Sequence, residues 1–119
     1  MLAGLYPSGY NLPMFTVIET DEFCAWLEGL KDGMTRIRLA RRLDKARRGN
    51  LGDVEPVGDG VSEMREFFGP GWRMYFIEQN GAIIVMLGGG DKSTQQRDIE
   101  RAKKLALELR NEQDQDPSI

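Results

Sequence analysis

Histidine is absent from the sequence, and Cys24 is the single cysteine among its 119 residues. Without histidine the chain lacks the commonest general base at neutral pH, and one cysteine can form neither an internal disulfide nor a cysteine zinc site. We therefore expect no metal and no other cofactor. Cys24 lies close to Phe23 and Trp26, so a buried core thiol is favoured over a nucleophile.

Long apolar segments are missing as well. Residues 1–13, MLAGLYPSGYNLP, begin without positive charge and contain only a broken apolar run, so they resemble neither a signal peptide nor a membrane span. We expect a cytoplasmic protein without membrane contact. Met14 is an alternative start of translation, and residues 1–13 are interpreted as an N-terminal extension.

The length and composition predict one domain. A chain of 119 residues has room for a single core, and 40% hydrophobic with 29% charged residues is ordinary for a globular protein. We expect the domain to span residues 1–119, with its core in residues 14–110. Residues 111–119, which include the acidic stretch EQDQD, are predicted to form a disordered tail.

The charge is unevenly distributed, although the net charge is only −3. Residues 35–48, TRIRLARRLDKARR, contain seven Lys or Arg against one Asp. Local potential rather than net charge attracts a polyanion. The segment is interpreted either as a solvated helix face or as a contact for RNA or the ribosome, for which Arg41, Lys45 and Arg48 are the candidate residues.

Two helices are predicted after a first strand at residues 15–19. Thr20 or Asp21 can cap the first helix, while Thr35 can cap the second and Gly49 can end it. The inward apolar positions of the second helix are Leu39, Ala40, Leu43 and Ala46, with its arginines outward. The four-residue link between the helices predicts a helical hairpin.

Four strands and a last helix follow. A short edge strand near residues 53–57 contains Pro56, which is tolerated at an edge or a bulge. The next strands are predicted at residues 62–68, 72–78 and 82–87. Three glycines close the last strand, and a helix is predicted over residues 91–111 with a capping box of Ser93 and Gln96. The order β-α-α-β-β-β-β-α predicts an α+β fold.

The hairpin MREFFGPGWRMYF, residues 64–76, contains two arginines beside aromatic rings. If GPG is a three-residue loop, Arg65 lies opposite Tyr75 and Phe67 lies opposite Arg73. Side chains alternate between the two faces of a strand. One face is then apolar, and the other collects Glu63, Arg65, Phe67, Arg73, Tyr75 and Ile77.

The two arginines need partners, because a buried unpaired charge costs several kcal/mol. One interpretation is a solvated face on which they pair with acids such as Glu63. The other is a face turned toward an anionic ligand, since an arginine pair flanked by Phe67 and Tyr75 can bind a phosphodiester and stack a base. The pattern leaves both interpretations open.

The segment GGGDKST, residues 88–94, lies between the last strand and the last helix. It either offers backbone N–H groups and Lys92 to a phosphate or is ordinary strand-exit geometry. It is not a P-loop, because that motif requires a glycine directly before the lysine, where this chain has Asp91.

Residues 38–76 and 88–106 resemble the RelE/ParE superfamily of type II toxin–antitoxin toxins, in the HigB-like branch of addiction-module killer proteins. The matching words are GNLGDV, PVG, GVSE, GPGWRMYF and GGDKSTQ. With the first strand and helix included, the resemblance covers about residues 14–110. It implies a RelE-like fold: a small, twisted, mainly antiparallel sheet packed by an N-terminal helical hairpin, with a C-terminal helix.

The resemblance further implies a metal-independent endoribonuclease that cleaves mRNA at the ribosome and inhibits translation. Arg65 and Arg73 match strand arginines of the family and would stabilise the transition state as the ribose 2′-OH attacks the adjacent phosphate. Lys92 would protonate the leaving group or contact the phosphate. Tyr75 and Phe67 would bind the substrate, with the basic helix alongside.

The resemblance leaves the general base open between Glu63 and Lys92, because some relatives use a histidine that this chain lacks. It also implies a cognate antitoxin, HigA-like and with a helix-turn-helix, through which alone operator DNA would be bound. ParE-type members of the superfamily inhibit DNA gyrase and cleave no RNA. That function and a catalytically inactive partner of the antitoxin are the alternatives.

Overall fold

The computed structural model describes residues 14–114 and confirms the predicted α+β class and order of elements. The predicted N-terminal extension, residues 1–13, and the last five residues of the predicted tail lie outside the described part. The elements are β1 (Thr16–Glu19), α2 (Asp21–Glu28), α3 (Gly33–Arg47), β2 (Val54–Gly58), β3 (Val61–Glu66), β4 (Trp72–Gln79), β5 (Ile83–Asp91), the short 3-10 helix η2 (Lys92–Thr94) and α4 (Gln95–Asp114). No helix in this range is long and apolar enough to cross a membrane.

The five strands form one mixed sheet in the order β1-β5-β4-β3-β2. β1 runs parallel to β5, and the other three pairings are antiparallel, which confirms a mainly antiparallel sheet. The parallel partners β1 and β5 are far apart in the chain: α2 and α3 lead from β1 to β2 at the opposite edge, and β3 and β4 lead back to β5. Pro56 lies in the edge strand β2 beside a register shift. Proline has no N–H to donate to a neighbouring strand, so it is tolerated at such positions.

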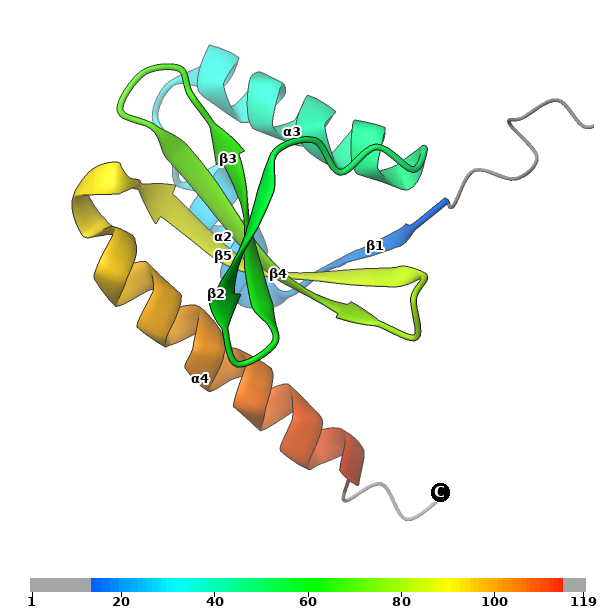
Figure 1. Cartoon of the computed structure of the whole chain (residues 1–119). Helices are drawn as coiled ribbons and strands as arrows, with labels where there is room; N and C mark the ends of the chain where they lie inside the picture. The colour runs from blue at the N-terminus through cyan, green and yellow to red at the C-terminus, as the bar shows by residue number, and fades with distance from the viewer. Residues whose placement is uncertain (1–13, 115–119) are drawn as a thin grey trace, which may run out of the picture.

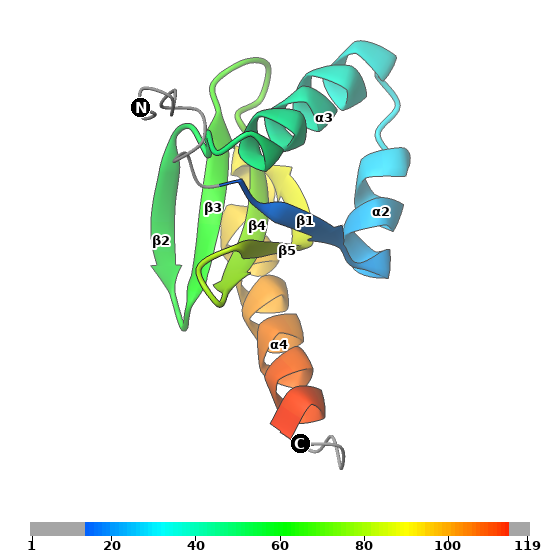
Figure 2. The same cartoon turned by 90° about the vertical axis from the view of Figure 1, so that its right-hand side faces the viewer.

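Two separate cores cover the two faces of the sheet. Side chains from α2 and α3 pack on Met64, Met74, Phe76, Ile84 and Met86. Side chains of α4 pack on Val61, Tyr75, Ile77, Val85 and Leu87. The sheet therefore lies between α2 and α3 on one face and α4 on the other (Figures 1 and 2). The two N-terminal helices are joined by the predicted four-residue link, residues 29–32, and Phe23 of α2 shares one core with Leu39 and Leu43 of α3.

The start of α3 differs from the prediction. Thr20 caps α2 as predicted, but Asp32 rather than Thr35 caps α3, because its carboxylate accepts hydrogen bonds from the Met34 N–H and the Thr35 hydroxyl. Ala40, predicted to be inward, is exposed. Arg42, predicted to be outward, is 6% exposed.

The last strand is longer than predicted, because the glycines that follow Leu87 belong to β5. A Cβ on Gly89 would overlap the Trp26 ring, and a Cβ on Gly90 would overlap the Asp98 carboxylate. These two glycines therefore allow α2 and α4 to approach the sheet closely, one on each face.

The last helix also begins and ends later than predicted. Asp91 caps η2 by accepting hydrogen bonds from the backbone N–H and hydroxyl of Ser93, so the predicted Ser93–Gln96 capping box is wrong. At the other end α4 continues to Asp114. The first part of the predicted disordered tail is therefore helical.

Candidate functional site

The β3–β4 hairpin has a register two residues away from the predicted one. Arg65 lies opposite Arg73, and Glu63 lies opposite Tyr75. The connecting loop is longer than GPG, because β3 already ends at Glu66. A shift of two residues keeps every side chain on its predicted face, so the separation into an apolar and a mixed face is confirmed.

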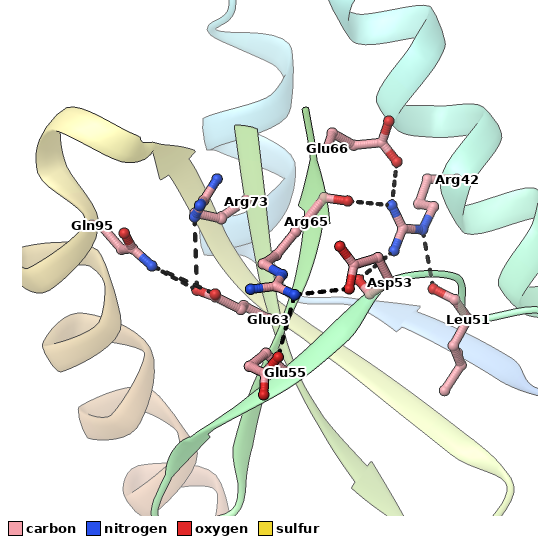
Figure 3. Close-up of polar contacts among 9 residues, drawn as sticks. All are labelled: Arg42, Leu51, Asp53, Glu55, Glu63, Arg65, Glu66, Arg73 and Gln95. Carbon is pink, nitrogen blue, oxygen red and sulfur yellow. Dashed lines mark hydrogen bonds and ion pairs between the residues drawn. The ribbon is translucent and has the colours of Figure 1, made fainter. Parts of the chain in front are cut away.

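Arg65 lies on the mixed face near the end of β3 and pairs with one carboxylate of β2 and one just before it. Its Nη2 is 3.0 Å from Oδ1 of Asp53 and 3.2 Å from Oε2 of Glu55, as Figure 3 shows. Phe67 is 74% exposed, with its ring centroid 5.7 Å from the Arg65 guanidinium carbon. The hydrogen bond to Asp53 raises the pKa of Arg65 above its ordinary value. This side chain therefore stays cationic.

Arg73 is buried, at 8% exposure. Its Nη1 donates to the carbonyl of Gly71 at 3.1 Å, and its Nε lies 4.0 Å from Oε1 of Glu63 without a hydrogen-bond partner. Glu63 is 3% exposed and accepts a hydrogen bond of 3.1 Å from Nε2 of Gln95, at the start of α4 (Figure 3). In one of the two interpretations left open by the sequence, Glu63 pairs with an arginine of this face; the structure places it beside Arg73.

Tyr75 does not lie at the surface where the sequence predicts a substrate-binding residue. Its side chain is fully buried under α4, and its hydroxyl has no hydrogen-bond partner. Burial and the carboxylates of Glu63 and Asp98 raise the pKa of Tyr75 well above its ordinary value. The predicted position beside Arg65 is wrong, and Tyr75 cannot stack on a base from this position.

Lys92 is exposed at the start of η2 and lies near Arg73. Gly71 lies between them: a Cβ on Gly71 would be 3.3 Å from Nη1 of Arg73 and 3.5 Å from the Cβ of Lys92. Trp72 and Asp91, the neighbours of these two cations, are paired across β4 and β5. We call Arg65, Arg73 and Lys92 the strand cations, because the hairpin and the end of β5 bring them to one end of the sheet.

The cations of α3 lie elsewhere. Arg41, Lys45 and Arg48 are exposed, as predicted. However, α3 packs on the face of the sheet opposite to Arg65 and Arg73. The prediction that the basic helix lies alongside the strand cations is therefore wrong. The helix lies on the opposite face of the sheet.

Arg42 connects α3 to the strand cations and was missed as a site residue. Its guanidinium donates to the carbonyls of Leu51 at 3.0 Å, Asp53 at 2.7 Å and Arg65 at 2.8 Å, and it pairs with Glu66. These contacts join the segment before β2 to the end of β3 (Figure 3). Arg42 thus holds the two segments that bear Arg65 and its partner Asp53.

Two other sequence predictions concern Cys24 and metal ions. Cys24 is half-buried on α2 rather than part of the core, and burial together with the Glu19 carboxylate raises the pKa of its thiol. Both observations disfavour a reactive thiolate.

Among residues 14–114, no group of three or more His, Cys, Asp or Glu side chains is arranged to hold a metal ion.

The chain is 44% identical over 87 residues to an uncharacterized protein of Haemophilus influenzae, in a match that covers 73% of this chain and 88% of the relative. The two proteins belong to the same family. No protein-family model and no solved structure matches the chain.

Proposed function

We propose that this chain is the toxin of a type II toxin–antitoxin module and that its family shares this role. The toxin cleaves mRNA at the ribosome without a metal ion. The observation that supports this most is the direct opposition of Arg65 and Arg73 on adjacent strands. Like charges in this position repel each other. An anion between them would offset the repulsion that the neighbouring carboxylates leave, and guanidinium groups bind a phosphodiester through charge-assisted hydrogen bonds.

The surroundings of the two arginines suggest different roles. Arg65 is 28% exposed and held by two carboxylates that are themselves accessible, so a phosphate can replace them. Arg73 is fixed by Gly71 and Glu63 and presents its guanidinium in one orientation. Arg65 thus binds the scissile phosphate, and Arg73 stabilises the charge that develops in the transition state.

Lys92, at the start of η2, and Phe67, in the loop between β3 and β4, complete the proposed site. Lys92 is exposed next to Gly71 and donates a proton to the leaving oxygen or contacts the phosphate. Phe67 is exposed beside Arg65 and offers a ring on which a base can stack. Glu63 orients Arg73 from its buried position. In the proposed reaction solvent water therefore takes up the proton of the 2′-OH as its oxygen attacks the phosphate and the bond to the leaving 5′-oxygen breaks.

The arrangement of elements supports the RelE-like assignment. A first strand, two helices on one face, four further strands and a C-terminal helix match the fold that the resemblance implies. The exposed cations of α3 then serve as a second contact with ribosomal RNA, on the other side of the sheet. A cognate HigA-like antitoxin would silence the toxin and provide the module's only contact with operator DNA.

Purified protein added to ribosomes programmed with a defined mRNA tests the proposal. We expect cleavage that continues in EDTA once the ribosomes are stabilised with polyamines, and products with a 2′,3′-cyclic phosphate or a 3′-phosphate. A folded protein that cleaves no mRNA, free or ribosome-bound, would contradict the proposal. DNA gyrase inhibition by the same sample would then identify the protein as a ParE-like inhibitor.

A further inference from the structure

The loop between β3 and β4 carries an aromatic side chain toward each face of the sheet. Phe67 continues the mixed face, and its ring centroid is 5.7 Å from the guanidinium carbon of Arg65. Phe68, the next residue, packs instead against the core beneath α2 and α3. The Gly71 N–H donates to the Phe68 carbonyl at 3.1 Å and closes the turn. The loop therefore joins the two faces at one end of the sheet (Figure 1).

Arg38 of α3 covers the second of these rings. Its guanidinium carbon is 3.7 Å from the centroid of the Phe68 ring, a direct cation–π contact. Arg38 is nevertheless exposed. In the part of the chain that the structure describes, no carboxylate pairs with Arg38, whereas Arg65 pairs with two. The ring thus holds the side chain in place, and the charge is left for a ligand.

An arginine held against a ring can bind a nucleotide in two ways. The plane of its guanidinium stacks on a base, and the N–H groups at its edge donate to a phosphate. A side chain that only covered Phe68 would need no charge. The charge and the exposure of Arg38 therefore favour a contact with a nucleotide over a purely structural role.

The Arg38–Phe68 pair lies between the two groups of cations. On one side of the loop are Phe67 and Arg65, on the mixed face. On the other side Arg41 and Lys45 follow Arg38 on α3 at spacings of three and four residues, so all three lie on one exposed face of the helix. A single strand that leaves the strand cations across the loop meets Arg38 first.

We propose that Arg38 and Phe68 form a nucleotide-binding subsite for the same single-stranded RNA that the strand cations bind. A base of the RNA stacks on the Arg38 guanidinium, whose edge donates to the adjacent phosphate. The subsite holds a nucleotide beside the scissile phosphate and takes no part in bond cleavage. This inference rests on the proposed function, because it assigns a further part of the same RNA strand.

Two RNA analogues without a free 2′-OH, which cannot be cleaved by the proposed reaction, test the subsite. One is a 2′-O-methyl dinucleotide with a single phosphate, and the other is a 2′-O-methyl pentanucleotide. Arg38→Ala should weaken binding of the pentanucleotide about tenfold, the order expected for one stacked base. It should leave the affinity for the dinucleotide unchanged, which also shows that the fold and the strand cations are intact. Fluorescence anisotropy at low salt measures both.

Two further variants separate stacking from charge. Arg38→Lys keeps the charge but loses the planar group, so it should bind the pentanucleotide about fivefold more weakly than wild type. Arg101→Ala removes an exposed arginine from α4 and should bind like wild type. An abasic residue moved along the pentanucleotide should weaken binding to the wild type at one position to which Arg38→Ala is insensitive.

Wild-type affinity for the pentanucleotide in Arg38→Ala or in Arg38→Lys would overturn the subsite. So would a wild-type protein that binds the pentanucleotide no more tightly than the dinucleotide, or that binds neither. The cleavage assay on programmed ribosomes decides the proposed function separately. Cleavage by a protein whose Arg38 variants bind RNA normally would leave that function standing and remove only the subsite.

Discussion

The chain has two groups of cations that differ in how firmly they are held. Arg65 and Arg73 lie on rigid strands, each with carboxylate neighbours at defined distances. Arg41, Lys45 and Arg48 lie exposed on α3, on the other side of the sheet. The first group can orient a reacting phosphate, whereas the second can only attract a polyanion.

Arg42 shows that local charge density alone does not reveal these roles. It belongs to the same basic run as Arg41, yet it is buried and donates to the Arg65 carbonyl and to the Asp53 carbonyl of the segment before β2. One run of sequence thus supplies both solvated cations and a structural guanidinium. The comparison therefore yields predictions in which neighbouring residues have very different effects.

The largest difference is expected between Arg42→Ala and Arg41→Ala. Arg42→Ala removes the guanidinium that donates to the carbonyls of Leu51, Asp53 and Arg65 and pairs with Glu66, and only the Asp53 carbonyl keeps another donor, the Arg65 N–H. The change should lower the free energy of unfolding by about 3 kcal/mol. Arg41→Ala should change it by less than about 0.5 kcal/mol. Urea unfolding followed by circular dichroism measures both. Equal losses would contradict the structural role of Arg42.

Charge reversal on α3 should affect binding but not chemistry. The triple variant Arg41→Glu, Lys45→Glu, Arg48→Glu should weaken association with ribosomes about tenfold at low salt, because long-range attraction is lost. The difference from wild type should shrink as salt rises. The cleavage rate at saturating toxin should stay unchanged. A reduced saturating rate would instead show that α3 takes part in the chemistry.

Glu55→Gln tests whether Arg65 binds the RNA phosphate. Removal of this carboxylate weakens the competition for Arg65, so RNA affinity should rise about twofold to fivefold, as expected for an exposed ion pair. Fluorescence anisotropy with a short single-stranded RNA measures the change. Glu78→Gln, an exposed change on the far part of β4, is the matched control. An unchanged affinity would mean that the phosphate does not reach Arg65.

The smallest effect concerns Asp91. Hydrogen bonds from Ser93 lower the pKa of this carboxyl below its ordinary value of 3.8, so its charged form stabilises the folded protein. Asp91→Ala should cost about 0.5 kcal/mol at pH 7. The difference from wild type should persist above pH 3.8 and shrink as the pH falls through the lowered pKa. Urea midpoints across this range check the sign, which a growing difference would contradict.

Alternation along the strands was enough to predict the faces of the hairpin. The register was not, because it depends on the length of the loop. β3 ends at Glu66 and the Gly71 N–H donates to the Phe68 carbonyl, so the turn begins before GPG. The faces nevertheless came out correctly, because an error of two residues preserves alternation.

The partners of the arginines depend on contacts that sequence spacing does not encode. Asp53 and Glu55 reach Arg65 only through the pairing of β2 with β3, and Gln95 reaches Glu63 only because α4 folds back over the sheet. Arg42 had a local signal that could have been used. It follows Leu39 by three residues on a helix whose buried stripe includes Leu39, Leu43 and Ala46.

The measurement that tests the proposed function most directly is single-turnover mRNA cleavage on programmed ribosomes at saturating protein. Arg65→Ala and the pair Arg73→Ala with Glu63→Gln, which avoids a buried unpaired carboxylate, are compared with the α3 triple variant. We predict that each strand variant loses about 100-fold or more in rate while the α3 variant matches wild type. Wild-type rates in the folded strand variants would contradict the claim that these arginines form the active site.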